Sequence, residues 1–480
     1  MVKRAIVIYL FFWSIGIVAA QVPDTLWTRT YGGASYEWAT WIEPAHDSGW
    51  VTAGYTASFG EGNRDMYIIK TRPDGSTEWA YTYGGENDDV ANDIKRTVDG
   101  GYIVCGYSNS YQAGSFYHIM KINSAGAFEW WREYGGDTSA NYGYGICQMQ
   151  DTGFLIVGSV YCHTIHGYDW DIYVVKTDAA GNLLNEYQII RANSQHGFRV
   201  IPTDDGGAIM VSGMGNSLII KFNAAGDTVW SHGYPGSSSI NSIIQLEDGG
   251  YAALGYRDRG YSIEDQFWLL RLNTIGDTIW TRYYGAIYPD VGYCLQQTHD
   301  GGFIMAGEMY PVDLPIDVFV VRAAANGDLL WSTHIGGVYE DYSYSVQCTP
   351  DSGYVIAGRT RSFGNGDFDY YFIRLGPDTL LSTGVEGEDS MLPTEIELEQ
   401  NYPNPFNNQT VIEYFVPAAS PVVIDIFDIH GRKVKSVDKG LVSAGYHQEA
   451  WDAGKNSSGV YFYRISAGSY SETKKMVLMK

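Results

Sequence analysis

Seven side chains that carry hydrogen-bond acceptors recur at one position of a repeated pattern, ten residues before an Asp-x-Gly turn. They are Glu37, Asp89, Asn141, Gln195, Ser238, Asp290 and Asp341. A ring of such oxygens around one opening would suit a cation or sugar hydroxyl groups. Carboxylates such as Asp89 or Asp341 could also act as the acid and base of glycoside cleavage. The favoured interpretation is structural, because a residue repeated in every unit commonly accepts hydrogen bonds from loop N–H groups.

Aromatic side chains accompany these polar positions. Trp38 follows Glu37, and Tyr342 and Tyr344 follow Asp341. Flat rings beside carboxylates and amides suit stacking on sugars or contact with proteins, although the same rings could pack one unit against the next. We assign no catalytic residue, and the candidate binding residues are Glu37, Asp89, Asp290, Asp341, Tyr342, Tyr344, Trp38 and Trp170.

Two segments could hold a metal. Residues 162–166 read Cys-His-Thr-Ile-His, which lacks the paired spacing of a structural zinc site. Residues 362–369 place oxygens at Asn365, Asp367 and Asp369, the alternate spacing of some calcium loops, but lack the distal bidentate glutamate. We therefore expect no metal or cofactor, with Ca²⁺ in the second segment as the alternative to a glycine turn. The chain has no Gly-x-Ser-x-Gly, His-Glu-x-x-His or P-loop motif.

Composition limits the class of partner. The 480 residues carry 31 Lys plus Arg against 55 Asp plus Glu, a formal charge of −24, which argues against nucleic acid or anionic lipid as the main partner. Glycine, at 57 residues, and aromatic residues, at 15%, exceed ordinary usage and argue against disorder. Five cysteines without regular spacing do not form a disulfide scaffold, and the sequence leaves any single pairing open.

The elements that position these residues follow from an internal repeat. The Asp-x-Gly turn begins at Asp47, Asp99, Asp151, Asp205, Asp248, Asp300 and Asp351. Apolar runs on both sides of each turn predict a β-hairpin. A third run ends in Lys or Arg, and a fourth usually contains tryptophan, so each unit of about 50 residues predicts four short strands.

Four-stranded units of this kind cannot bury both faces alone, so they must pack against one another. The sequence predicts an all-β fold with a seven-bladed β-propeller over residues 21–381. An open β-solenoid is the alternative. The fourth-strand pattern occurs eight times, so a terminal copy, around Trp27 or around Leu380, would close the ring; the sequence leaves open which one.

The N-terminus has the pattern of an export signal. Lys3 and Arg4 precede an apolar run from Ala5 to Ala20, which predicts a signal peptide at 1–20. The sixteen apolar residues fall short of the ~20 that a membrane-spanning helix needs. We expect no transmembrane segment in the mature chain.

The composition changes after residue 381. Residues 382–398 are acidic and lack aromatic residues, as expected of a linker. Residues 399–480 predict a small immunoglobulin-like β-sandwich, with short strands between turns. This region contains four sequence motifs in order: Asn-Tyr-Pro-Asn-Pro-Phe-Asn at 401–407, Ile-Phe-Asp-Ile-His-Gly-Arg at 426–432, Gly-Val-Tyr-Phe-Tyr at 459–463 and Lys-Lys-Met-Val-Leu at 474–478.

This ordered set closely resembles the type A C-terminal sorting domain of the type IX secretion system. The residues that carry the resemblance are Asn401, Pro403, Asn404, Pro405, Phe406, Gly431, Gly459 and Tyr461. It implies that the signal peptide takes the chain across the inner membrane and that the outer-membrane translocon and sortase machinery then act on the tail. Such tails are typically cleaved, which leaves the cargo released or attached to surface lipopolysaccharide. The repeat region resembles the Asp-Gly-Gly repeat cargo found upstream of such tails, a group without a defined activity.

We therefore expect a secreted or surface-attached propeller that acts as a binding or scaffold module. Its expected ligand is an extracellular glycan or protein. Two alternatives stay open: a polysaccharide hydrolase or lyase, and an inert structural spacer. The sequence does not identify the ligand.

Overall fold

The structure is a computed structural model of the whole chain. It describes residues 22–111, 114–135, 140–164, 167–190, 194–213, 217–234, 238–257, 266–285, 290–310, 315–378, 396–398, 401, 404, 406, 409–416, 420–442, 445–454, 456–468 and 470–479. The signal peptide expected at 1–20, most of the expected linker, Leu380, Pro403 and Pro405 lie outside these residues. The chain divides into two compact units, 1–383 and 384–480. No helix occurs in these described ranges, and hence none that could cross a membrane.

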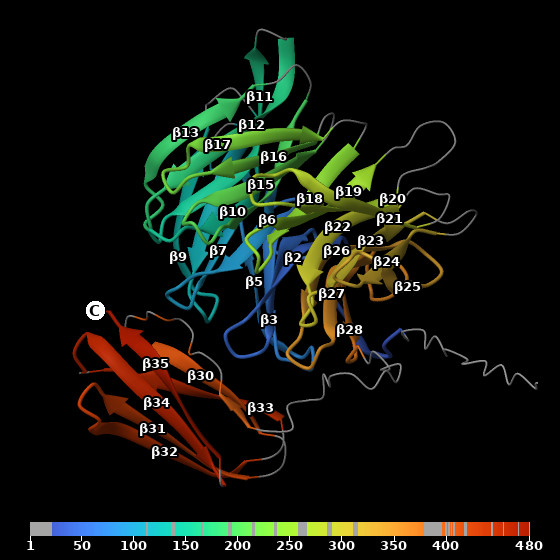
Figure 1. Cartoon of the computed structure of the whole chain (residues 1–480). Helices are drawn as coiled ribbons and strands as arrows, with labels where there is room; N and C mark the ends of the chain where they lie inside the picture. The colour runs from blue at the N-terminus through green and yellow to red at the C-terminus, as the bar shows by residue number, and fades with distance from the viewer. Residues whose placement is uncertain are drawn as a thin grey trace, which may run out of the picture. The chain divides into compact units, whose positions relative to one another are not determined.

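The first unit holds seven four-stranded antiparallel sheets (Figure 1). Sheet one is β2 (Glu37–Pro44), β3 (Trp50–Thr56), β4 (Asp65–Thr71) and β5 (Thr77–Tyr83). Sheet two is β6 (Asp89–Arg96), β7 (Tyr102–Ser108), β8 (Phe116–Ile122) and β9 (Phe128–Tyr134). Sheet three is β10 (Asn141–Gln148), β11 (Phe154–Thr164), β12 (Gly167–Thr177) and β13 (Leu183–Ile189).

The other four sheets repeat this order. Sheet four is β14 (His196–Pro202), β15 (Ala208–Gly213), β16 (Ser217–Phe222) and β17 (Thr228–Tyr234). Sheet five is β18 (Ser238–Gln245), β19 (Tyr251–Arg257), β20 (Gln266–Leu272) and β21 (Thr278–Tyr284). Sheet six is β22 (Asp290–Gln297), β23 (Phe303–Met309), β24 (Asp317–Ala323) and β25 (Leu329–Ile335). Sheet seven is β26 (Asp341–Cys348), β27 (Tyr354–Thr360), β28 (Asp369–Leu375) and β1 (Thr25–Tyr31).

Each sheet begins with a hairpin closed by the Asp-x-Gly turn. The middle residue of the turn has a positive φ, for example Gly100 at 86°, and Ser48, Thr152 and Ser352 adopt it in three turns despite their side chains. The turn aspartate accepts a hydrogen bond from the following glycine N–H, at 3.0 Å between Asp99 and Gly101. The basic residue of the third strand pairs with that aspartate in all seven sheets: Lys70, Lys121, Lys176, Lys221, Arg271, Arg322 and Arg374.

The sheets pack in chain order and the last meets the first. β3 packs against β6, and so on through β23 against β26, while β2 packs against β27. β1 is the outer strand of sheet seven, where Thr28 lies opposite Ile373 on β28. The strand around Trp27 therefore completes the last sheet from the other end of the chain. The resulting all-β arrangement is propeller-like.

A hydrogen bond joins most neighbouring sheets at their outer strands, which we call the tyrosine clasp. A tyrosine hydroxyl on the fourth strand donates to the carbonyl of a positive-φ glycine in the next sheet. In five of the six pairs the tryptophan four residues before the tyrosine also lies beside this glycine. The pairs are Tyr31 with Gly75, Tyr83 with Gly126, Tyr134 with Gly181, Tyr187 with Gly226, Tyr234 with Gly276 and Tyr284 with Gly327. Sheet six ends in Ile335 at this position.

Asp378 takes over the junction between sheets six and seven. Its carboxylate accepts from Arg322 Nε at 2.7 Å and from the Trp331 indole at 3.1 Å, both in sheet six. It also accepts from the Tyr354 hydroxyl of sheet seven at 2.9 Å. One buried carboxylate therefore replaces the clasp that Ile335 cannot form.

We expect Tyr284→Phe to lower the free energy of unfolding by about 1–3 kcal/mol, because the buried carbonyl of Gly327 loses its donor. Chemical denaturation measures the change. Tyr339→Phe is the matched control, since that ring is 55% exposed. Equal effects of the two substitutions would contradict a structural role for the clasp.

The second unit contains two sheets that share one apolar core. One sheet is β29 (Glu397–Leu398), β30 (Gln409–Val416) and β33 (Gly445–Asp452). The other is β32 (Lys433–Val442), β31 (Ser420–Asp428), β34 (Gly459–Ala467) and β35 (Tyr470–Leu478). Ile396 and Leu398 belong to this core, so the end of the expected linker is part of the second unit.

Candidate functional site

A cavity of about 660 Å³ lies where the first strands of all seven sheets converge, and we call it the central cavity. Its lining residues are Trp38, Thr40, Tyr55, Arg64, Val90, Asn92, Tyr107, Tyr144, Phe198, Arg199, Asn241, Tyr293, Glu308, Tyr310, Tyr342, Tyr344 and Arg359. A cavity of this size lies within the range of small-molecule binding sites. The lining is rich in tyrosine and carries charged groups from several sheets.

A β-bulge at the same place in every first strand supplies one lining residue per sheet. The bulged residues are Thr40, Asn92, Tyr144, Phe198, Asn241, Tyr293 and Tyr344. A bulge leaves one residue unpaired and redirects its side chain, which explains why all seven face the cavity. The residue types in the sequence do not reveal this ring, although each member lies seven residues before a turn aspartate.

The polar bulge residues also connect neighbouring sheets. Thr40 donates to the carbonyl of Ala91 at 2.9 Å, and Asn92 donates to that of Gly143 at 2.7 Å. Asn241 donates to that of Gly292 at 2.8 Å. The aromatic members leave their rings at the cavity instead, so the ring of bulges is chemically uneven.

A second set of lining residues lies on the second strands, each directly after a glycine near the end of the strand. Sheets one and two place Tyr55 and Tyr107 there, whereas sheets six and seven place Glu308 and Arg359. Neighbouring sheets thus bring an acid and a base to one cavity at equivalent positions. This departure from the repeat is the strongest chemical asymmetry of the lining.

Arg359 is a buried cation held by aromatic rings. Its guanidinium carbon lies 3.7 Å from the ring centroid of Trp38, 4.2 Å from that of Tyr342 and 4.7 Å from that of Phe368. It donates to the Tyr36 hydroxyl, while Nε has no partner. Burial lowers the pKa of Arg359 to about 10. Within the described residues no carboxylate pairs with it.

Glu308 is 3% exposed and surrounded by phenols. The Tyr310 hydroxyl donates to its carboxylate at 2.9 Å, and Tyr293 and Tyr344 also hydrogen-bond to it. Burial raises the pKa of Glu308 to about 7, although the tyrosine hydrogen bonds oppose the shift. Its charge is therefore poised to change near neutral pH.

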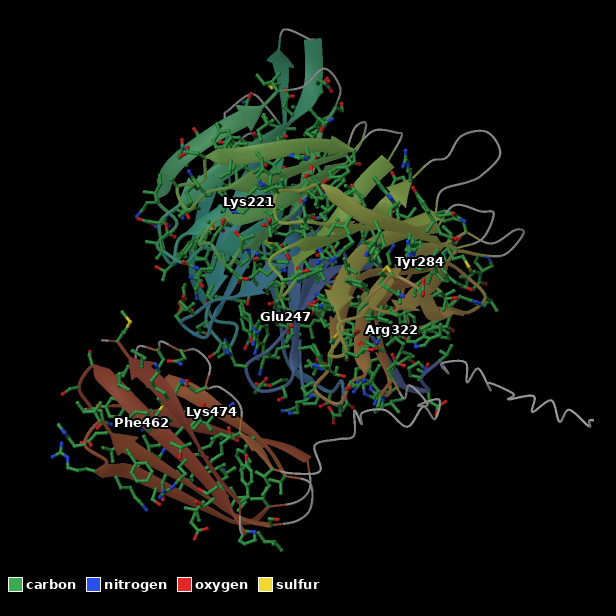
Figure 2. All side chains as sticks on the ribbon, in the orientation of Figure 1. Lys221, Glu247, Tyr284, Arg322, Phe462 and Lys474 are labelled. Carbon is green, nitrogen blue, oxygen red and sulfur yellow. The ribbon has the colours of Figure 1, made fainter. Side chains whose placement is uncertain are left out.

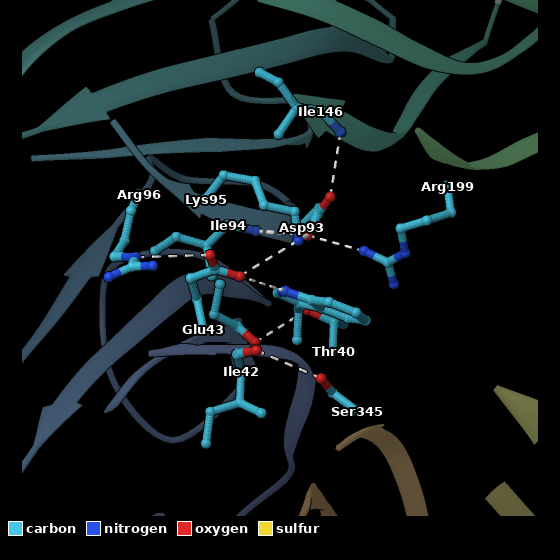
Figure 3. A network of polar contacts seen from close by, with 12 residues as sticks. Thr40, Ile42, Glu43, Asp93, Ile94, Lys95, Arg96, Ile146, Arg199 and Ser345 are labelled. Atoms are coloured by element: carbon cyan, nitrogen blue, oxygen red, sulfur yellow. Dashed lines mark hydrogen bonds and ion pairs between the residues drawn. The ribbon is translucent and has the colours of Figure 1, made fainter. Parts of the chain in front are cut away.

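A second arginine at the cavity, Arg199, is paired with a carboxylate (Figure 3). Its Nη1 lies 2.9 Å from Asp93 Oδ1, and Lys95 Nζ lies 3.0 Å from the same oxygen. The Arg199 guanidinium and Lys95 ammonium lie 3.6 and 4.0 Å from the Trp41 ring centroid. The other Asp93 oxygen accepts from the Ile146 N–H at 3.2 Å. This network joins sheets one to four and contrasts with Arg359.

The predicted acidic residues do not reach the central cavity. Glu37, Asp89, Asp290 and Asp341 are each at most 1% exposed and begin first strands. Glu37 accepts from the N–H of Gly33, Asp89 from that of Gly85 and Asp341 from that of Gly337, each at 2.8 Å. Glu37, Asp89 and Asp341 thus bind loop backbone, as in the structural interpretation. Asp89 also lines a separate cavity of about 340 Å³ with Tyr111 and Trp131, and Asp341 is not among the residues that line that cavity.

The predicted aromatic residues lie in two different places. Trp38, Tyr342 and Tyr344 line the central cavity. Trp170 lies on the long β11–β12 hairpin, where it stacks on Tyr142 with centroids 5.3 Å apart. The structure therefore brings three of the four predicted rings together with Arg359.

The calcium-like segment is organised around a carboxylate cap. Asp369 Oδ2 accepts from the N–H groups of Asn365 at 2.8 Å and Gly366 at 3.1 Å. In this arrangement the Asp369 oxygen accepts hydrogen bonds from the backbone of a glycine turn. The five cysteines, all among the described residues, are free thiols.

The sorting-motif residues that the structure describes support the second unit's core. The Asn401 backbone N–H donates to the Tyr463 hydroxyl, and Asn404 Oδ1 accepts from the Val477 N–H, both at 2.8 Å. Phe406 and Tyr461 both pack against Trp451, with ring centroids 5.5 and 5.3 Å away. Gly431 and Gly459 have positive φ values of 75° and 156°. The first of these motifs thus forms hydrogen bonds to the last two strands of the domain.

Solved structures of low identity align with parts of the chain. A surface component of the type IX secretion system of Porphyromonas gingivalis, PorZ, is 12% identical with a TM-score of 0.37, over 89% of this chain and 65% of that one. The Pan2 WD40 domain of Neurospora crassa is 8% identical with a TM-score of 0.45, over 73% and 98%. YCF48 of Cyanidioschyzon merolae is 12% identical with a TM-score of 0.43, over 73% and 99%. No curated protein matches the sequence.

The family comparison concerns the tail. Residues 400–479 match the family described as the secretion system C-terminal sorting domain. This match covers the second unit and agrees with the resemblance of its ordered motifs to type IX tails. The tail implies interaction with the type IX secretion machinery, and it supports export of this propeller-like protein to the cell surface or beyond.

Proposed function

We propose that this protein is an exported seven-bladed β-propeller that binds an extracellular glycan or protein in its central cavity. The observation that carries the proposal is the cavity itself, which all seven sheets line and which sheets six and seven make asymmetric with Glu308 and Arg359. Pseudo-symmetric rings commonly place function where the repeat breaks. Trp38, Tyr342 and Tyr344 place aromatic surface beside these charged groups.

The architecture and export route complete the proposal. The seven sheets are the blades, and β1 completes the seventh blade from the other end of the chain by covering the edge of β28. The two sheets of the second unit form an immunoglobulin-like sandwich that comprises the sorting domain expected at 399–480 together with β29. A signal peptide at 1–20 starts export, the acidic segment from 382 links the units, and sortase processing of the tail releases the propeller or attaches it to the surface.

Binding is favoured over catalysis by the chemistry of the lining. Glycoside hydrolysis usually needs two carboxylic groups that flank the scissile bond. Among the residues that line the central cavity, Glu308 is the one carboxylic acid, and three tyrosines hold it. A lyase remains the catalytic alternative, and an inert spacer the structural one.

A glycan array and a protein-ligand screen with the purified protein test the proposal. We expect binding that weakens by about tenfold or more in Trp38→Ala, because one stacking face is lost. Trp170→Ala, outside the central cavity, is the matched control and should bind normally. New reducing or unsaturated ends would favour an enzyme, and the absence of any ligand would favour a spacer.

A further inference from the structure

We propose that the central cavity binds an acidic saccharide, whose carboxylate pairs with Arg359 while its ring stacks on neighbouring aromatic faces. This inference rests on the proposed binding function and names its ligand class. It begins from a charge that the protein leaves unbalanced.

Arg359 is exceptional among the buried basic residues. Lys70, Lys121, Lys176, Lys221, Arg199, Arg322 and Arg374 each lie within 4.0 Å of a carboxylate. Arg359 is 9% exposed and has no such partner within the described part of the chain. Burying an unpaired charge costs several kcal/mol, so an incoming anion would recover an interaction that the fold does not supply.

The donors of Arg359 are incompletely used. A guanidinium has five N–H donors in a planar fork, which matches a carboxylate. One donor reaches the Tyr36 hydroxyl, and the buried Nε has no partner. The aromatic rings fix the position of the guanidinium without neutralising it. The group is therefore preorganised for an anionic ligand.

The rest of the lining gives the same charge preference. Arg64 also lines the central cavity, and its guanidinium lies 5.3 Å from the Tyr55 ring centroid. Glu308 is the acid among the lining residues, and hydrogen bonds from tyrosines occupy its carboxylate. A cavity with cationic groups stands out in a chain whose formal charge is −24. Electrostatic complementarity with an anion is thus local to this site.

The aromatic and hydroxyl groups distinguish a saccharide from a simple anion. Trp38, Tyr342 and Tyr344 line the cavity with aromatic surface, and Asn92 and Asn241 add amide groups. A pyranose offers apolar C–H faces for stacking and hydroxyl groups for hydrogen bonds. A uronic acid adds a carboxylate at the edge of that ring, where Arg359 can meet it.

The test compares acidic glycans with their carboxyl-reduced counterparts. Short hexuronate oligomers of gluco, galacto and manno configuration and sialylated oligosaccharides are titrated at about pH 6, where Glu308 is largely neutral. We expect at least one acidic glycan to bind about 10- to 100-fold more tightly than its reduced form. Arg359→Met should abolish this difference, and Arg361→Met, an exposed arginine paired with Glu340, should keep it.

The outcomes separate this inference from the proposed function. Equal binding of acidic and reduced glycans would overturn the acidic class and leave glycan binding in place. Binding of an acidic peptide alone, lost in Arg359→Met, would overturn the saccharide. The failure of every glycan and protein probe would remove both proposals. Arg359→Lys keeps the charge but loses the planar fork, so it should retain part of the preference if Arg359→Met does not fold.

Discussion

Replacing Arg322 with methionine is expected to lower the free energy of unfolding by about 3–5 kcal/mol, as when one partner of a buried ion pair is removed. Arg322 is 2% exposed and lies on β24 (Figure 2). Its Nε donates to Asp378 at 2.7 Å, and Nη2 donates to Asp300 at 2.6 Å. Chemical denaturation of both proteins at the same pH measures the loss.

The loss should come mainly from Asp378. Its side chain is 4% exposed, whereas that of Asp300 is 41% exposed and can be solvated. Without Arg322, Asp378 would keep only the Trp331 and Tyr354 donors and would remain a buried charge without a counterion. This junction has no tyrosine clasp, because sheet six ends in Ile335. The substitution therefore weakens the junction at which Asp378 replaces the clasp.

Arg282→Met is the matched control. Arg282 pairs with Asp328 at 4.0 Å, and both side chains are more than 40% exposed, so its loss should cost less than about 1 kcal/mol. Asp378→Asn combined with Arg322→Met should recover part of the loss, because the buried charge is then gone. Similar small losses for Arg322→Met and Arg282→Met would show that the buried pair does not support the junction.

Much of the architecture follows from local signals in the sequence. An Asp-x-Gly turn needs positive φ at its middle residue and a side-chain acceptor at its first, and both requirements leave a visible mark such as Asp99-Gly100-Gly101. Closure of the last sheet was not predictable in this way. The strand around Trp27 and the segment around Leu380 have similar patterns, and the pairing of β1 with β28 depends on contacts between distant parts of the chain.

The candidate site was predicted less completely than the fold. Glu37 and Asp341 stood out because they are acidic and recur in the repeat. They recur because each carboxylate accepts a hydrogen bond from an N–H group of the loop before its strand. The bulge residues were missed because a bulge selects no residue type: Thr40 and Phe198 occupy equivalent places. Arg359 emerged only when the structure placed a charged residue where other sheets have tyrosine.

Glu308→Gln should make the protein more stable at alkaline pH. In the native protein burial raises the pKa of Glu308 from 4.5 to about 7. The neutral acid is therefore favoured by folding, so its contribution is fully present below pH 4.5 and is lost as the pH rises through about 7. A shift of this size corresponds to about 3 kcal/mol, since each unit of pKa is worth about 1.4 kcal/mol.

The comparison isolates Glu308 from the other acids of the chain. Glutamine keeps an acceptor for the Tyr293, Tyr310 and Tyr344 hydroxyls but cannot ionise. The difference in the free energy of unfolding between the two proteins should therefore grow in favour of the variant between about pH 5 and pH 8, with the other titrating groups cancelling. Glu340→Gln, which removes a partly exposed acid paired with Arg361, is the control and should leave the pH profile nearly unchanged. Parallel profiles for the native protein and Glu308→Gln would mean that Glu308 is already ionised without cost, and the central cavity would then hold a compensated pair of charges rather than an arginine that awaits an anion.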